Sequence, residues 1–245
     1  MNHQRPVNPE KEFHSEAYLY HNRARFDHFQ SLGLPVEGKS VLELGAGIGD
    51  HTAFLLSLGA QEIMAVEARD ENIAVLRERF QDMEEVSVLK MDLETPVPLH
   101  RTFDLVYCYG LLYHLANPGV ALEWMAGATK EILVLETCVA PSAEGKGVVV
   151  VPEKQDKVSQ SFSGRGSRPT REWIMEKLSG LFPYAYVTVT QPDHPEFPLD
   201  WNAVNRGNRH TRAVFIGANL CLDANQHLSR NLLHVHRKLE RESLR

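Results

Sequence analysis

The stretch Val41-Leu-Glu-Leu-Gly-Ala-Gly-Ile-Gly-Asp-His-Thr52 is the starting point, because an apolar run passes through a glycine-rich turn into a helical segment. Glycines after a first strand let the backbone approach a ligand closely, at the edge where open α/β sheets bind nucleotides. Gly45, Gly47 and Gly49 have the spacing G-x-G-x-G. A dinucleotide site needs G-x-G-x-x-G, but position 50 is Asp50, whose charge would repel a pyrophosphate. The turn therefore argues against an NAD-dependent dehydrogenase.

Around this turn, short apolar runs alternate with helical segments, which is typical of a doubly wound, mostly parallel sheet with helices on both faces. The predicted strands are 40–44, 62–67, 86–91, 103–109, 131–138, 185–190 and 211–218, and the last two would form an antiparallel edge. The predicted helices are 15–32, 51–58, 69–80, 118–129 and 170–178, the last with Thr170 as its N-cap. We expect an α/β, Rossmann-like, seven-stranded sheet.

The domain organisation follows from the same pattern. Residues 1–37 are a polar lead followed by a capping helix, and 38–218 form the main domain. Two insert loops, 139–169 and 191–210, are long and rich in turn residues, so we expect them to face a ligand. Residues 219–245 are predicted as a tail helix, since leucines recur among basic residues there, and this helix could support a homodimer.

The composition limits the class of protein. With 26 Lys and Arg against 32 Asp and Glu, the net charge of −6 argues against a broad nucleic-acid footprint, although a local basic groove stays open. The chain shows neither an apolar signal region nor the roughly 18 apolar residues of a membrane span. Its 3 cysteines lie far apart and form no Cys-x-x-Cys pair, which argues against a disulfide scaffold. We expect a cytoplasmic protein that does not bind membranes.

Acidic residues follow the predicted strands at the ligand-binding edge. Glu67 closes the second strand, where a carboxylate can accept ribose hydroxyls, and Asp92 closes the third, where it can receive an adenine amino group. Glu43 adds a negative charge near the turn. These acids favour a ligand with a cationic head and no phosphate. With the E-x-G-x-G-x-G loop, they make residues 41–138 similar to class I S-adenosylmethionine-dependent methyltransferases.

The resemblance implies S-adenosyl-L-methionine as the cofactor and assigns a set of residues to it. These cofactor-binding residues are Glu43, Gly45, Gly47, Gly49, Glu67, Asp92, Leu93 and Tyr109. No metal is required in this class. Catechol-type methyltransferases place metal-binding acids after the fourth strand, where this chain has Gly110 to Leu112, so we expect no metal. We interpret His14, His21 and His28, which recur every seven residues, as surface residues.

Two side chains are candidate general bases. His114 leaves the fourth strand at the ligand edge with a near-neutral imidazole, and Glu136 ends the fifth strand, where burial would raise its pKa. A packing role for His114 stays open. The candidate substrate residues are Tyr113, Arg165, Arg168 and His194, for which core packing or a solvated loop is the alternative.

Three functions remain open at this point. The first is transfer of a methyl group from S-adenosylmethionine to a small-molecule acceptor, most simply at oxygen. The second is tRNA modification, because Gly110 to His114, Leu133 to Thr137 and Val151-Pro152 are similar to the wobble-uridine carboxymethyltransferases, which use carboxylated S-adenosylmethionine. The third is a non-catalytic, S-adenosylmethionine-binding regulatory subunit, against which the intact glycines and acids speak.

Overall fold

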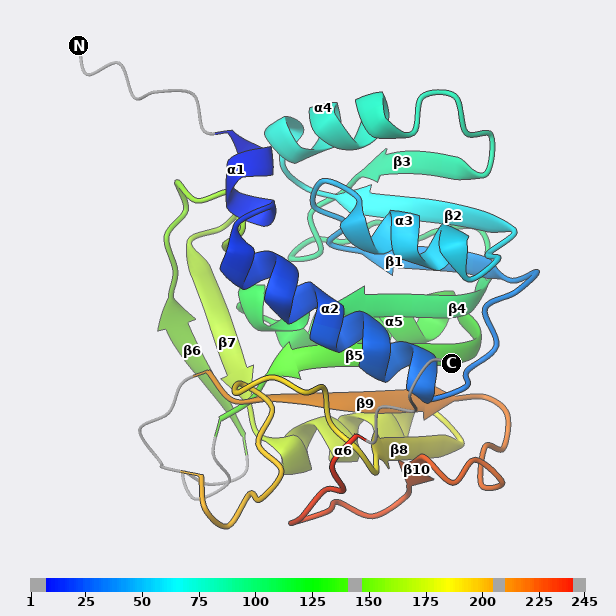
Figure 1. Cartoon of the computed structure of the whole chain (residues 1–245), viewed down its shortest axis with the longest axis vertical. Coiled ribbons are helices and arrows are strands. Elements are labelled where there is room, and N and C mark those ends of the chain that lie inside the picture. The colour runs from blue at the N-terminus through cyan, green and yellow to red at the C-terminus, as the bar shows by residue number, and fades with distance from the viewer. Residues whose placement is uncertain (1–7, 141–146, 205–209, 240–245) are drawn as a thin grey trace.

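The chain forms one mixed sheet with helices on both faces, in a computed structural model that describes residues 8–140, 147–204 and 210–239 (Figure 1). The sheet has 8 strands in the order β10-β8-β9-β5-β4-β1-β2-β3. In chain order they are β1 (Ser40–Leu44), β2 (Glu62–Glu67), β3 (Val86–Lys90), β4 (Phe103–Tyr109), β5 (Thr129–Cys138), β8 (Tyr184–Thr188), β9 (Arg212–Ala218) and β10 (Leu228–Ser229). Strands β3, β2, β1, β4 and β5 are parallel, and β9, β8 and β10 pair antiparallel. The Rossmann-like prediction is confirmed, but the sheet has one strand, β10, beyond the seven predicted.

The helices cover the two faces of this sheet (Figure 1). They are α1 (Pro9–Phe13), α2 (Glu16–Ser31), α3 (Asp50–Ser57), α4 (Asp70–Arg79), α5 (Pro118–Ala128) and α6 (Arg171–Leu181), with a short 3-10 helix η1 (Leu112–His114). Helices α2, α3 and α4 pack on one face, and α5 and α6 pack on the other. The side chain of Thr170 accepts from the Trp173 N–H, so the predicted N-cap of α6 is confirmed.

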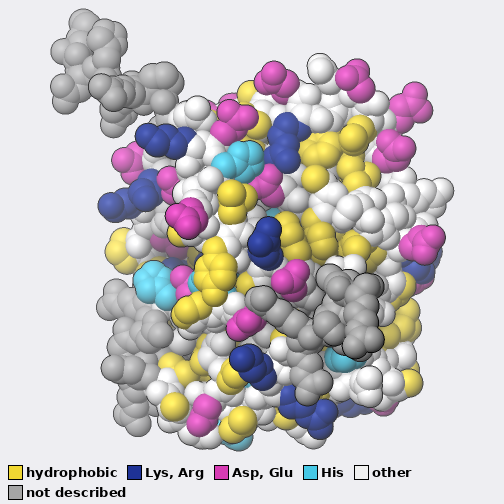
Figure 2. All heavy atoms as spheres, in the orientation of Figure 1, with side chains coloured by type: hydrophobic (Ala, Val, Ile, Leu, Met, Phe, Trp, Pro, Cys, Tyr) yellow, Lys and Arg dark blue, Asp and Glu magenta, His cyan; other side chains and the backbone are white. Residues whose placement is uncertain are grey.

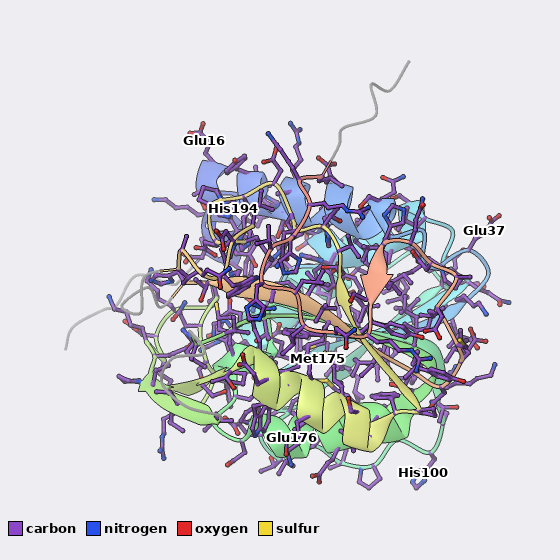
Figure 3. All side chains as sticks on the ribbon, turned by 90° about the horizontal axis from the view of Figure 1, so that it is seen from below. Glu16, Glu37, His100, Met175, Glu176 and His194 are labelled. Carbon is purple, nitrogen blue, oxygen red and sulfur yellow. The ribbon has the colours of Figure 1, made fainter. Side chains whose placement is uncertain are left out.

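The core lies on both sides of the sheet because successive strand residues point to opposite faces. One cluster takes in Val41, Ile63 and Leu105, and the other takes in Leu42, Val106 and Leu133. Each fully buried side chain of this kind contributes about 1.5–3 kcal/mol. Helix α6 shows the same division, since Met175 faces the sheet and Glu176 faces outward (Figure 3).

Helix α2 is tied to segments from the other end of the chain. His28 Nε2 donates a hydrogen bond to the carbonyl oxygen of Thr190, at a distance of 3.1 Å. The side-chain amide of Asn225 donates to the carbonyl of Leu32, directly after α2, at 2.8 Å. Phe29 packs edge-on against Tyr107 of the central strand β4. The first long helix is therefore held between the sheet and the last third of the chain.

Two sequence predictions are wrong here. The insert 139–169 contains a hairpin, β6 (Val148–Pro152) paired with β7 (Arg165–Pro169), because four consecutive valines favour an extended strand. Its residues 141–146 lie outside the described part. Residues 219–239 contain no helix. This tail adds β10 and forms isolated β-bridges at Val235 and Arg237. Its leucines pack against the core from this extended chain. The homodimer contact expected from a tail helix loses its basis, and residues 240–245 lie outside the described part.

Within the described residues, every helix is too short or too polar to cross a lipid bilayer.

Candidate active site

A cavity of about 320 Å³ opens at the carboxyl ends of the parallel strands. Its floor is the turn after β1 with the ends of β2 and β4, and its walls are α1, α2 and the loop 153–163 between β6 and β7. Of the residues assigned from sequence, the cavity is lined by Gly45, Gly47, Glu67, Asp92, Leu93, Tyr109, Tyr113 and His114. The predicted ligand edge of the sheet is therefore where the cavity lies.

The three glycines of the turn have different roles. All adopt left-handed backbone angles, with φ of 73°, 57° and 90° at Gly45, Gly47 and Gly49. A Cβ on Gly47 would lie 3.1 Å from the ring of Phe13, so this glycine lets α1 close over the cavity. Gly49 does not line the cavity; it is the N-cap of α3, and a Cβ there would lie 2.5 Å from the Phe80 ring. Close packing of α4 therefore requires a glycine here, and the contact of Gly49 with the cofactor stays a prediction.

Glu67 organises the turn from the end of β2. One carboxylate oxygen accepts from the Gly47 N–H at 2.8 Å, and the other accepts from the N–H groups of Ala68 and Arg69 at 2.8 and 2.9 Å. Burial raises the pKa of Glu67, although these hydrogen bonds oppose the shift. Carboxylate oxygens have two lone-pair positions each, so Glu67 can hold the turn and still accept from a ligand hydroxyl.

Asp92 and Leu93 lie in the cavity wall after β3, and the Asp92 carboxylate accepts from the Glu94 N–H at 2.9 Å. Tyr109, at the end of β4, also lines the cavity, and its hydroxyl has no hydrogen-bond partner. These positions suit the roles that the resemblance implies for them. Glu43 does not: it is buried beneath the turn, away from the cavity wall, and accepts from the Thr52 hydroxyl at 2.6 Å. Burial raises its pKa to about 8.

Helix α2 and the start of α3 contribute residues that sequence reasoning missed. Asn22, Arg25 and Asp50 all line the cavity, and each has a buried polar atom without a partner: Nδ2, Nε and Oδ2 respectively. The Arg25 guanidinium reaches the end of β4, where a Cβ on Gly110 would lie 3.0 Å from its Nη2. Donors and an acid grouped this way fit the carboxylate and ammonium of an amino acid, which is one end of S-adenosylmethionine. The only sequence signal was the i, i+3 spacing of Asn22 and Arg25.

Glu136 is held by two arginines and does not line the cavity. Its carboxylate accepts from Arg25 at 2.7 Å and from Arg212 at 3.0 Å, and its side chain is completely buried. Arg212 also binds Glu196 at 2.7 Å and donates to the Tyr113 hydroxyl at 2.9 Å. Both of its oxygens serve a buried ion-pair network that joins α2, β5 and β9, and the role of Glu136 as a base stays a prediction.

His114 is the sequence-predicted base that the structure does place in the cavity wall. Its Nδ1 lies 2.5 Å from a carboxylate oxygen of Glu153, in the loop after β6, which leaves Nε2 as the second ring nitrogen. Burial is the main cause of the lowered pKa of His114, and Glu153 partly offsets it. The imidazole is therefore neutral near pH 7 and can accept a proton.

Three predicted substrate residues do not line the cavity. Arg165 is exposed on β7. Arg168 donates to the carbonyl of Tyr113 at 3.1 Å and pairs with Glu153 at 3.4 Å, so it supports the wall from behind. His194 lies beside α2 (Figure 3) and stacks on His21 with ring centroids 4.5 Å apart. The contact of these three residues with a substrate stays a prediction that the cavity lining does not support.

One group among the described residues has side chains close enough to hold a metal ion: the candidate atoms of His21, His194 and Glu196 lie within 4.8 Å of one another. The two rings are stacked with an angle of 24° between them, and planes so nearly parallel do not direct both nitrogen lone pairs at one nearby ion. Glu196 is also held by Arg212. Of the three residues, His21 and Glu196 line the cavity. His21 and His28 are buried, so their interpretation as surface residues is wrong.

Comparison with known proteins agrees with this geometry. Residues 41–131 match the family described as a methyltransferase domain. A tRNA U34 carboxymethyltransferase of Methylococcus capsulatus is 31% identical over 123 residues, which are 49% of this chain and 37% of that protein. The corresponding enzyme of Pseudoalteromonas translucida is 30% identical over 125 residues, 48% of this chain and 37% of that protein. The matched part is thus little more than a third of these relatives.

Solved structures share the fold at lower identity. The N-terminal domain of EvdMO1, in the presence of SAH and D-fucose, has a TM-score of 0.62 and 22% identity, over 83% of this chain and 84% of that one. An S-adenosylmethionine-dependent methyltransferase from Mesorhizobium loti has a TM-score of 0.58 and 16% identity, over 80% and 98% of the two chains. Residues 41–131 are thus similar to a methyltransferase domain, and the chain shares its fold with solved S-adenosylmethionine-dependent methyltransferases.

Proposed function

We propose that the chain transfers a methyl group from S-adenosylmethionine to an oxygen atom of a small hydroxylated molecule. The observation that carries this proposal is His114, a buried imidazole whose pKa is lowered by desolvation, in the wall of the cavity that Glu67 and Asp92 also line. S-adenosylmethionine supplies an activated methyl group on its sulfonium. A neutral His114 would accept the proton of an attacking hydroxyl, a contribution of about 10²–10⁴ in rate for general-base catalysis.

The proposed cofactor contacts follow the floor of the cavity. Glu67 would accept the ribose hydroxyls while it holds the glycine turn, and Asp92 would accept the adenine amino group. Asn22 and Arg25 would donate to the methionine carboxylate, and Asp50 would accept from its ammonium. This order places the methionine end beside α2, next to the residues that we assign to the acceptor.

The acceptor end of the cavity carries balanced charges. Arg25 and Arg212 are paired with Glu136 and Glu196, so the charges of these two guanidinium groups are compensated. Further hydroxyl and imidazole groups of the lining come from Tyr18, Tyr113, His21 and His210. Such a wall favours a neutral acceptor with several hydroxyls. The presence of D-fucose with the EvdMO1 domain supports a sugar as the first acceptor to test.

The test begins with calorimetric titration of the full chain with S-adenosylmethionine and, separately, with NADH. We expect binding of S-adenosylmethionine alone. Radiolabelled S-adenosylmethionine is then incubated with D-fucose, with related sugars and with unfractionated tRNA, and transfer to a sugar supports the proposal. Binding without transfer to any acceptor favours the regulatory-subunit alternative.

The tRNA alternative has one specific support, the names of the curated relatives. Against it stands the charge of the chain, which is −6 overall. Figure 2 shows acidic and basic side chains mixed over the described part of one face, without a basic stripe there. With sugars inactive, methyl transfer to tRNA in the radiolabel assay, or carboxymethyl transfer to tRNA when carboxylated S-adenosylmethionine is the donor, would replace the sugar proposal with this one.

We also propose a cytoplasmic location. The cysteines Cys108, Cys138 and Cys221 are all free thiols, and Cys221 is exposed. An exposed free thiol fits a reducing compartment, where glutathione and thioredoxin keep thiols reduced.

A further inference from the structure

Glu153 is a buried acid that directly contacts the candidate base His114. It follows β6 and lies in the insert that sequence analysis interpreted as a loop. One of its oxygens lies 2.5 Å from His114 Nδ1 and accepts from the Ser161 N–H at 2.9 Å. The other lies 3.4 Å from an Arg168 guanidinium nitrogen. Only 4% of the Glu153 side chain is exposed, so the carboxylate has fixed partners rather than water.

The charge states of Glu153 and His114 determine which ring nitrogen of His114 carries the proton. Burial acts to raise the pKa of Glu153, but the hydrogen bond and charge of His114, the Ser161 N–H and Arg168 together lower it. The pKa of His114 is lowered as well, mainly by burial. An ionised carboxylate can only accept, so the neutral ring donates from Nδ1 and keeps the lone pair of Nε2 free.

The surrounding loop is built to hold Glu153 in place. A Cβ on Gly166, in the facing strand β7, would lie 2.5 Å from a Glu153 oxygen and 2.4 Å from the Tyr113 carbonyl, so β7 carries a glycine there to make room. Ser161, which donates to Glu153, in turn accepts from the Arg69 guanidinium through its carbonyl at 2.9 Å. Arg69 directly follows the segment that Glu67 holds. The loop 153–163 thus connects the cofactor end of the cavity with the base.

We propose that Glu153 is a positioning residue that holds His114 in the Nδ1–H tautomer, with Nε2 presented to the acceptor as the base. The proposal deepens the methyl-transfer function proposed above and rests on it for its catalytic meaning. It also gives the β6–β7 insert a role, because the insert supplies the acid that fixes the ring. Glu153 itself does not need to contact the acceptor.

The test follows the His114 ring by NMR and needs no acceptor. The full chain is labelled with ¹⁵N-histidine, and the His114 signals are assigned by their loss in His114→Gln. Wild type is compared with Glu153→Gln, which keeps the shape and removes the charge. The matched control is Glu12→Gln, because Glu12 binds the same loop through Ser159 at 2.8 Å without contacting His114.

We expect wild type to carry the ring proton on Nδ1. In Glu153→Gln the pKa of His114 should fall by about one unit, a tenfold loss of proton affinity, because Arg168 and Arg212 then face the ring without the carboxylate. Glu12→Gln should match wild type in the position of the ring proton and in the pKa of His114. A proton on Nε2 in wild type, or an identical His114 titration in wild type and Glu153→Gln, would overturn the proposal. Failure of the proposed function would show separately, as absence of methyl transfer in the radiolabel assay.

Discussion

Replacement of Glu43 by Gln should change the pH dependence of stability without changing cofactor binding. The Glu43 side chain is buried beneath the glycine turn, one oxygen accepts from Thr52, and the other has no partner. Burial raises its pKa from 4.5 to about 8. The folded state therefore holds this proton over a pH range in which the unfolded chain releases it.

The direction and the size of the effect on the free energy of unfolding follow from that pH range. A carboxyl whose pKa is raised on folding contributes stability that is fully present below pH 4.5 and is lost as the pH rises to about 8. At about 1.36 kcal/mol per unit, the contribution is on the order of 5 kcal/mol. Gln imitates the protonated acid and does not titrate. The free energy of unfolding of Glu43→Gln relative to wild type should therefore increase by up to about 5 kcal/mol between about pH 5 and about pH 9.

Urea unfolding of both proteins across this pH range is the assay, and the other titrating groups cancel because both proteins share them. A difference between the two proteins that stays constant with pH would refute the raised pKa of Glu43. Calorimetry with S-adenosylmethionine should show equal affinity for wild type and Glu43→Gln, because Glu43 does not line the cavity. A weaker affinity would return Glu43 to the cofactor site.

Three further substitutions test the site and its support. Glu67→Ala should weaken S-adenosylmethionine binding by about 1–3 kcal/mol in calorimetry, because the ribose hydroxyls lose a charged acceptor; an unchanged affinity would remove Glu67 from the site. His114→Ala should lower methyl transfer by about 10²–10⁴ while donor affinity stays nearly intact, whereas equal losses of folding stability and activity would support a packing role. Gly49→Ala should lower the free energy of unfolding by about 1–3 kcal/mol, measured with urea, because φ is +90° and the new Cβ would meet Phe80; wild-type stability would contradict the packing seen there.

Much of the fold could be predicted because the deciding signals are local. The run Ile132 to Leu135 is apolar on both faces, and a parallel strand buried on both sides forms one continuous hydrophobic segment in the sequence. The glycine turn and the acids at the strand ends sit at fixed places relative to those strands. Strands β1, β2 and β4 therefore begin and end at the predicted residues. Strand β10 was not predicted because its two residues gain order only by pairing with β8.

The site was less predictable, because its walls come from segments far apart in the chain. Arg25 and Arg212 meet at Glu136 across long sequence separations, and no local pattern in either segment signals that meeting. A single arginine in a helical segment predicts only a solvated side chain. Glu153 was missed for a similar reason, since an acid in a Gly- and Ser-rich insert carries no periodic signal. Sequence patterns indicated cavity residues at the sheet edge. They did not indicate the residues that tertiary packing brings to this edge from other segments.

The way α2 is held has a consequence for synthesis of the chain. Its hydrogen bonds to Thr190 and from Asn225 join the first long helix to segments that leave the ribosome after the parallel strands. Until then, the apolar side of α2, with Phe29 and Leu32, lacks part of its cover, although the central strands are already made. A product truncated before Asn225 would retain the parallel strands and the glycine turn, but it would lose one of the clamps that seat α2 and its Arg25. We therefore expect cofactor binding to be acquired only after residue 225 has been made.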